Sequence, residues 1–429
     1  MRRTFSLFLA GALATCLLGG ELVGRAEGDF RASNSTANVA LASPQSDVFA
    51  KLGSDAIDNP TTGRVPNYLR AIAAIYPDST QPFAHLFKTV LYGGTLPSET
   101  KAAMGYQIAV ANGSPYATAH LTRILEATET GRNLLNAMQN RRTPAERERV
   151  ALRYAVNLNK AVLGVSDSEF VQVRAQFNDA QIVEMTITVC FFNYFSRFAQ
   201  GAGLPLETWA KEKPNALPAE ASGKGYGARV TIASDAEMQM ANKVLNPAPA
   251  PKGGSLGIGI ANSQRAMLRV PDLADSWWGY WRALREKTKL PRTTQLHISF
   301  AVSMANGCRY CTLHQVAGLR RQGVDITKLL SMQKEDAMLS PKELSAVVFA
   351  RKLTKAPGAM SAADYNALKT GLGDEQEALD ALLQTCAFSF MNRFTDGLRL
   401  PSEEEAVKVY QEVYGDGSYK DYHTNRTRK

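Results

Sequence analysis

Apolar residues recur three and four positions apart along the chain, which is the period of a helix with one buried face. The pattern is clearest in two sets: Ile182, Val183, Ile187, Cys190, Phe191 and Tyr194, and then Leu379, Leu382, Leu383, Cys386, Phe390 and Phe394. Asp374 and Glu377 stand where a capping pair would start the second of these helices. The sequence has no alternating polar and apolar runs between hairpin turns, so it predicts an all-α fold.

The helical pattern occurs twice. Residues 111–120 read ANGSPYATAH and residues 305–314 read ANGCRYCTLH, with six of ten positions identical at an offset of 194. Further matches follow in the same order at offsets of 194 and 196: Pro77-Asp78 with Pro271-Asp272, Leu96-Pro97 with Leu290-Pro291, residues 188–198 with 384–394, and Leu204-Pro205 with Leu400-Pro401. Ordered matches at a nearly constant offset predict a tandem duplication of one helical unit.

Composition divides the rest of the chain. Residues 246–259 (NPAPAPKGGSLGIG) are rich in Pro, Ala and Gly, which is typical of a linker. The sequence predicts six segments: a signal peptide at 1–26, a linker at 27–62, a first helical domain at 63–212, a second linker at 213–258, a second helical domain at 259–411 and a tail at 412–429.

The N-terminus has the features of a secretory signal peptide. Its apolar stretch at residues 5–20 is shorter than the about 20 residues that a membrane helix needs, and residues 24–26 (GRA) form a small-x-small cleavage site. Residues 2–5 (RRTF) also match the core of a twin-arginine signal, and residues 13–16 faintly resemble a lipoprotein box. We therefore expect an exported protein, periplasmic or extracellular.

Composition and charge indicate a globular protein and do not favour a nucleic-acid-binding function. Hydrophobic residues make up 45% of the chain and charged residues 21%, which indicates a globular protein. The net charge is +9, but the densest basic run, residues 141–153, is interleaved with Glu146 and Glu148 and carries no alternating aromatic residues. This pattern favours a solvated helix face over a nucleic-acid surface.

The candidate chemistry lies on one cysteine pair. Cys308 and Cys311 are three residues apart, and His314 follows three residues later, so a helix would place all three on one side. Asn306-Gly307 predicts a helix end just before them. If Cys308 begins a new helix, the free N–H groups and the dipole there favour a thiolate.

Residues 290–323, which include ANGCRYCTLHQ and RRQG, resemble the alkylhydroperoxidase D-like branch of the carboxymuconolactone decarboxylase family. The resemblance implies two tandem all-helical domains of a kind that forms homo-oligomers and needs no cofactor or metal. It implies a hydroperoxide or small disulfide as substrate and a thiol reductant of unknown identity. It also implies that Cys311 becomes a sulfenic acid, that Cys308 supplies a proton and closes the disulfide, and that a His and a Glu form a proton relay.

The sequence departs from the family pattern in two places. Leu296 stands twelve residues before Cys308, where the family has the Glu of its relay. His314 follows the second cysteine by three residues, whereas the commonest spacing is four, which is Gln315 here. His297 is adjacent to the missing Glu, so we predict it as the substitute base and His314 as the proton relay.

The first repeat lacks this chemistry. Ser114 and Ala117 replace the two thiols, while His120 is kept, so the first repeat has a structural role as the partner surface of the second. Cys190 and Cys386 occupy matched positions on apolar helix faces and are expected to be core thiols.

Two other functions compete with a thiol peroxidase. Cys308, Cys311, His314 and His297 could form a zinc-binding module, although their tight spacing on one helix disfavours tetrahedral ligation. The other alternative is a non-redox lyase resembling the decarboxylase itself, in which the cysteine pair would be incidental. A c-type haem site is excluded because Thr312, not His, follows the second cysteine.

Overall fold

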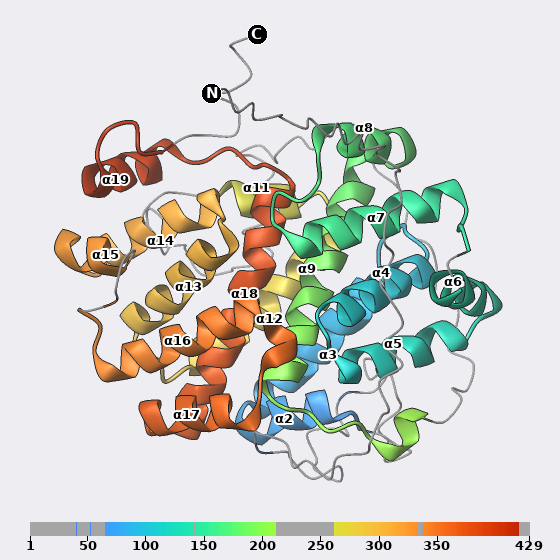
Figure 1. Ribbon diagram of the computed structural model, residues 1–429, viewed down its shortest axis with the longest axis horizontal. Helices are drawn as coiled ribbons and strands as arrows, with labels where there is room; N and C mark the ends of the chain where they lie inside the picture. The colour runs from blue at the N-terminus through green and yellow to red at the C-terminus, as the bar shows by residue number, and fades with distance from the viewer. Residues whose placement is uncertain are drawn as a thin grey trace, which may run out of the picture.

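The computed structural model describes residues 65–140, 142–211, 261–332 and 338–419, together with Ala40, Leu52 and Asp336. These residues form helices joined by short turns, and none of them lies in a strand, which confirms the predicted all-α class (Figure 1). The predicted signal peptide and nearly all of both predicted linkers lie outside the described residues. No helix in the described part of the chain is both long and apolar enough to cross a bilayer.

The helices fall into two halves, which we call the first half (residues 65–211) and the second half (residues 261–419). The first half contains α2 (Asn67–Ile75), α3 (Pro77–Tyr92), α4 (Ser98–Ala111), α5 (Pro115–Glu126), α6 (Glu129–Gln139), α7 (Glu146–Lys160), α8 (Asp167–Gln176), α9 (Asp179–Gly201) and the 3-10 turn η3 (Thr208–Lys211). The second half contains α11 (Asn262–Met267), α12 (Pro271–Lys287), α13 (Arg292–Asn306), α14 (Arg309–Arg321), α15 (Ile326–Met332), α16 (Pro341–Lys355), η4 (Pro357–Ala359), α17 (Ala362–Leu372), α18 (Glu375–Gly397) and α19 (Glu404–Tyr414).

The helix order is the same in both halves. From α2 and α11 to α9 and α18, each first-half helix has a second-half counterpart that starts 194 to 197 residues later. The two long helices α9 and α18 lie side by side at the centre, with first-half helices on one side and second-half helices on the other (Figure 1). This arrangement is the one that a duplicated unit would give, although the duplication itself and its domain boundaries stay predictions.

Local sequence explains where the central helices start. At the start of α9, the Asn178 side chain accepts the backbone N–H of Gln181, and the Gln181 side chain accepts the backbone N–H of Asn178. These two bonds form a capping box. The Asp374 side chain likewise accepts the backbone N–H of Glu377 at the start of α18, so the predicted capping pair is confirmed. Both helices have 23 residues, and most of their side chains are buried, because each faces its own half and the other helix.

Matched contacts join the halves. Arg197 donates from Nη2 to the backbone oxygen of Thr354 at 3.2 Å, and Arg393 donates from Nη2 to that of Asn159 at 2.9 Å. Each guanidinium therefore meets the last turn of a helix in the opposite half, where the dipole favours a cation. Both arginines are buried, and burial lowers the pKa of Arg393 to about 10. The Tyr194 and Tyr280 hydroxyl oxygens, one from each half, lie 2.7 Å apart.

The two remaining cysteines lie in the core, and the last helix extends into the predicted tail. Cys190 and Cys386 are free thiols with no exposed surface, as predicted for core cysteines. α19 continues to Tyr414, three residues past the predicted tail boundary after residue 411, and the boundary itself stays a prediction. The physical reason is that Val413 is buried against α14 and α15 and the neighbouring side chains of α19 pack beside it.

Candidate functional site

The turn between α13 and α14 places the cysteine pair. Gly307 ends α13 in the left-handed conformation with φ 70°, and Cys308 is the N-cap of α14. The Cys308 sulfur accepts the backbone N–H of Cys311 at 3.3 Å, as a capping side chain does. The predicted helix end and the new helix at the cysteines are therefore confirmed. Cys308 has no exposed surface and Cys311 is 4% exposed, so Cys311 is the more accessible residue of the pair.

Replacing Gly307 with Ala should cost about 1–2 kcal/mol of unfolding free energy, measured by urea denaturation. A Cβ at this position meets nothing within 4 Å, so the cost would come from the positive φ alone. Gly307→Asn is the matched control and should cost less, because asparagine tolerates this conformation. Equal losses for both variants would show that the turn, and with it the placement of Cys308, does not depend on its backbone conformation.

The hydroxyl of one threonine lies within hydrogen-bonding distance of both sulfurs. Thr395 on α18 places its Oγ1 3.5 Å from the Cys308 sulfur and 3.4 Å from the Cys311 sulfur. The same hydroxyl lies 3.0 Å from the backbone oxygen of Met391, to which it donates. Because a hydroxyl has one proton and two lone pairs, Thr395 can accept from a thiol in this state and donate to a thiolate after rotation.

The next residue brings a carboxylate to the same place. Asp396 is 1% exposed, and its Oδ2 accepts the backbone N–H of Arg309 at 3.3 Å. Burial, the hydrogen bond with Cys311 and the charge of Asp396 hold the pKa of the Cys308 thiol well above its ordinary value. Burial and the charge of Asp396 therefore oppose the thiolate that the helix N-terminus is expected to favour at Cys308.

His314 lies in a buried polar cluster one turn along α14. Its Nδ1 donates to the backbone oxygen of Tyr310 at 2.6 Å, and its Nε2 is 2.7 Å from Oε2 of Glu403. Glu403 also accepts the Tyr310 hydroxyl at 2.8 Å and the backbone N–H of Asn262 at 2.6 Å. Burial alone would raise the pKa of Glu403, but His314 and these donors hold it below the usual range. Both imidazole nitrogens of His314 thus face acceptors other than a sulfur.

His297 lies in a different environment. Its Nδ1 is 2.8 Å from Oε1 of Glu343 on α16, and Lys328 is 3.0 Å from the other oxygen of that carboxylate. Burial lowers the pKa of His297 to about 4 despite the nearby Glu343. The structure therefore pairs His297 with the Glu343 carboxylate, and its role as a base stays a prediction. Within the described ranges, no three His, Cys, Asp or Glu side chains gather as a metal ion would require.

The first half repeats the histidine cluster without the thiols. His120 Nε2 is 2.9 Å from Oε2 of Glu207, and the Tyr116 hydroxyl donates to Glu207 at 2.7 Å. The backbone N–H of Asn67 also donates to Glu207. Ser114 caps α5 in place of Cys308, accepting the backbone N–H of Ala117 at 3.4 Å. A histidine–glutamate–tyrosine cluster thus forms in both halves, with and without cysteines.

Sequence reasoning missed Glu403, Thr395 and Asp396. Glu403 had a signal, because the matched Leu-Pro pairs continue as L-P-x-E in both halves, ending at Glu207 and Glu403. Thr395 and Asp396 had no such signal, since nothing in the linear order shows that the end of α18 meets the start of α14.

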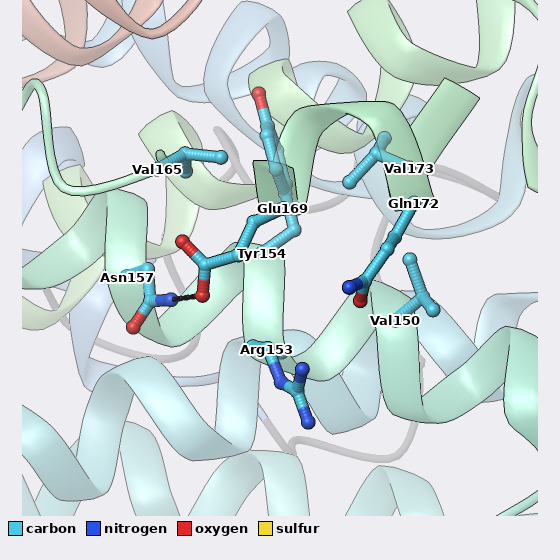
Figure 2. A pocket seen from close by; sticks show the side chains of 8 residues that line it. All are labelled: Val150, Arg153, Tyr154, Asn157, Val165, Glu169, Gln172 and Val173. Atoms are coloured by element: carbon cyan, nitrogen blue, oxygen red, sulfur yellow. Dashed lines mark hydrogen bonds between the residues drawn. The ribbon is translucent and has the colours of Figure 1, made fainter. Parts of the chain in front are cut away.

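A small hollow elsewhere in the molecule does not involve these residues. It lies between α7 and α8 in the first half, where the Asn157 amide donates to Glu169 at 2.6 Å (Figure 2). Its lining residues are Val150, Arg153, Tyr154, Asn157, Val165, Glu169, Gln172 and Val173. Glu169 also completes the capping box of α8, so this carboxylate already has a structural role.

Part of the second half is similar to one protein family. Residues 271–352 match the Carboxymuconolactone decarboxylase family. This segment includes both cysteines, His314 and His297, whereas Thr395, Asp396 and Glu403 lie beyond it. A search of curated protein sequences gave no match.

Solved structures with similarity to the chain include two of the debrominase Bmp8. A single-residue variant of Bmp8 in complex with 2,3,4-tribromopyrrole is 20% identical, covers 44% of this chain and 100% of its own, and has a TM-score of 0.36. The apo form is 21% identical, covers 43% of this chain and 97% of its own, and also has a TM-score of 0.36.

Proposed function

We propose that the protein is a thiol peroxidase of the alkylhydroperoxidase D-like type, with Cys311 as the attacking sulfur and Cys308 as its partner. The observation that carries this proposal is the convergence of two free thiols on the Thr395 hydroxyl at the start of a helix. Cys311 is the better placed to attack because it retains some exposed surface. Cys308 is buried and keeps its proton at neutral pH, so it can protonate a leaving alkoxide.

The proposed reaction has two steps. The Cys311 sulfur attacks the distal oxygen of a hydroperoxide, the O–O bond breaks, and an alcohol leaves with a proton while Cys311 becomes a sulfenic acid. The Cys308 sulfur then attacks the Cys311 sulfur, the S–O bond breaks, and water leaves as the disulfide forms. A thiol reductant, of unknown identity, returns both sulfurs to thiols. His314 stays the predicted proton relay.

A thiol count tests this proposal. The reduced protein, treated with one equivalent of cumene hydroperoxide and then unfolded, should lose two titratable thiols and release one equivalent of alcohol. Peptide mapping should place the new disulfide between Cys308 and Cys311 and leave Cys190 and Cys386 reduced. A protein that consumes neither hydroperoxide nor a small disulfide would contradict the proposal and favour the non-redox lyase.

A further inference from the structure

The Thr395 hydroxyl makes four contacts at the dithiol. Its Oγ1 lies 3.5 Å from the sulfur of Cys308 and 3.4 Å from that of Cys311. It also lies 3.0 Å from the backbone oxygen of Met391 and 3.4 Å from that of Asn392, one turn back along α18. Thr395 has no exposed surface, so these four neighbours, rather than bulk water, decide how the hydroxyl is oriented.

The chemistry of these neighbours fixes the direction of each hydrogen bond. A hydroxyl has one proton and two lone pairs, whereas a backbone oxygen can only accept. A carbonyl oxygen is also a stronger acceptor than a thiol sulfur, so the hydroxyl proton points to the backbone oxygens of Met391 and Asn392. The lone pairs are left for the two sulfurs. In the reduced protein, Thr395 therefore accepts hydrogen bonds from the thiols.

The thiols have protons to donate only while the pair is reduced. Both cysteines are free, and burial, followed by Cys311 and the charge of Asp396, keeps the pKa of the Cys308 thiol well above its ordinary value. Oxidation to a disulfide removes both S–H protons. The lone pairs of a buried hydroxyl then lose their donors, which is unfavourable because no water replaces them. The hydroxyl thus stabilises the dithiol by an interaction that the disulfide cannot make.

Two other positions show which part of this arrangement is special to the dithiol. Thr385, also buried on α18, donates its hydroxyl proton to the backbone oxygen of Ala381 at 2.7 Å, so the bond to the preceding turn is not particular to Thr395. In the first half, where the thiols are replaced, the residue matched to Thr395 at the offset of 196 is Ala199. What distinguishes Thr395 is that its lone pairs face two sulfurs.

We propose that Thr395 is a positioning residue that stabilises the dithiol relative to the disulfide and so makes the oxidised pair easier to reduce. The inference rests on the proposed peroxidase function, in which a thiol reductant must restore the pair after each turnover. In that step two reductant thiols become a disulfide, the bond between Cys308 and Cys311 breaks, and one proton returns to each sulfur. Both protons then lie within reach of the Thr395 hydroxyl.

The redox equilibrium of Thr395→Val tests this role, because valine keeps the shape of threonine and lacks the hydroxyl. The protein is equilibrated in glutathione and dithiothreitol redox buffers, quenched with acid, unfolded and alkylated, and the disulfide fraction is read from peptide masses. Thr395→Val should shift the equilibrium about fivefold towards the disulfide, the size expected for one hydrogen bond, or about 20 mV. Thr395→Ala should shift it in the same direction, and Thr395→Ser should restore it to near the wild-type value.

Thr385→Val is the matched control, because it removes the same kind of helical hydrogen bond from the same helix. It should leave the redox equilibrium unchanged. An unchanged equilibrium in Thr395→Val, or a shift towards the dithiol, would overturn the proposal. So would an equal shift in Thr385→Val, a shift that serine does not reverse, or a wild-type pair that forms no disulfide in any buffer. The expected shifts in a protein that consumes no hydroperoxide would support the role of Thr395 and contradict only the peroxidase function.

Discussion

Cys311→Ser should abolish hydroperoxide consumption while leaving the protein folded. The sulfur of Cys311 is the atom proposed to attack oxygen, and a serine hydroxyl at this position is a far weaker nucleophile. The Thr395 hydroxyl can hydrogen-bond an oxygen as well as a sulfur, and the Cys311 backbone N–H can still donate to Cys308, so the fold should be retained. The measurement is alcohol release from cumene hydroperoxide, with helix content followed by circular dichroism.

The partner variant should behave differently. Cys308→Ser should form one sulfenic acid on Cys311 and then stop, because no thiol remains to close the disulfide. Dimedone labelling with mass spectrometry would detect this product, and Cys190→Ala is the control because Cys190 lies in the core on α9. Labelling of Cys308 in the Cys311→Ser variant, together with retained turnover, would reverse the two assignments.

Glu403→Ala and Glu207→Ala should each lower the free energy of unfolding by about 3 kcal/mol, because each leaves a buried histidine without its carboxylate. Similar losses would show that the cluster serves the fold in both halves. The exposed Glu405→Ala should change stability by less than about 0.5 kcal/mol in the same urea titration. A negligible loss in Glu403→Ala with a large loss of turnover would instead support His314 as a proton relay.

The contribution of Glu403 to the free energy of unfolding should depend on pH, because the pKa of Glu403 is lowered in the folded protein. A carboxylate whose folded pKa lies below its unfolded value stabilises the protein above the unfolded value of 4.5. The contribution should disappear as the pH falls through the folded pKa. The difference in stability between wild type and Glu403→Ala should therefore shrink in acid, and a difference that stays constant down to that range would contradict the assignment.

Much of the fold could be predicted from the sequence, because helical periods and capping residues depend only on residues close together in the chain. Asp374 predicted the start of α18, and Asn306-Gly307 predicted the end of α13. The protonation state of Cys308 could not be predicted, because it depends on burial and on Asp396, which lies 88 residues further along the chain. The environment of His297 could not be predicted for the same reason, since its partner Glu343 lies on α16 and is distant in the sequence.

The exchanged contacts of Arg197 and Arg393 have a consequence for how the protein behaves at low concentration. Each half completes a helix end of the other, so the buried face between α9 and α18 resembles the contact between two subunits. Here both partners belong to one polypeptide, and their effective concentration is set by the chain that joins them. Dilution, which would separate two independent subunits, should leave this pairing intact while each polypeptide carries a single dithiol.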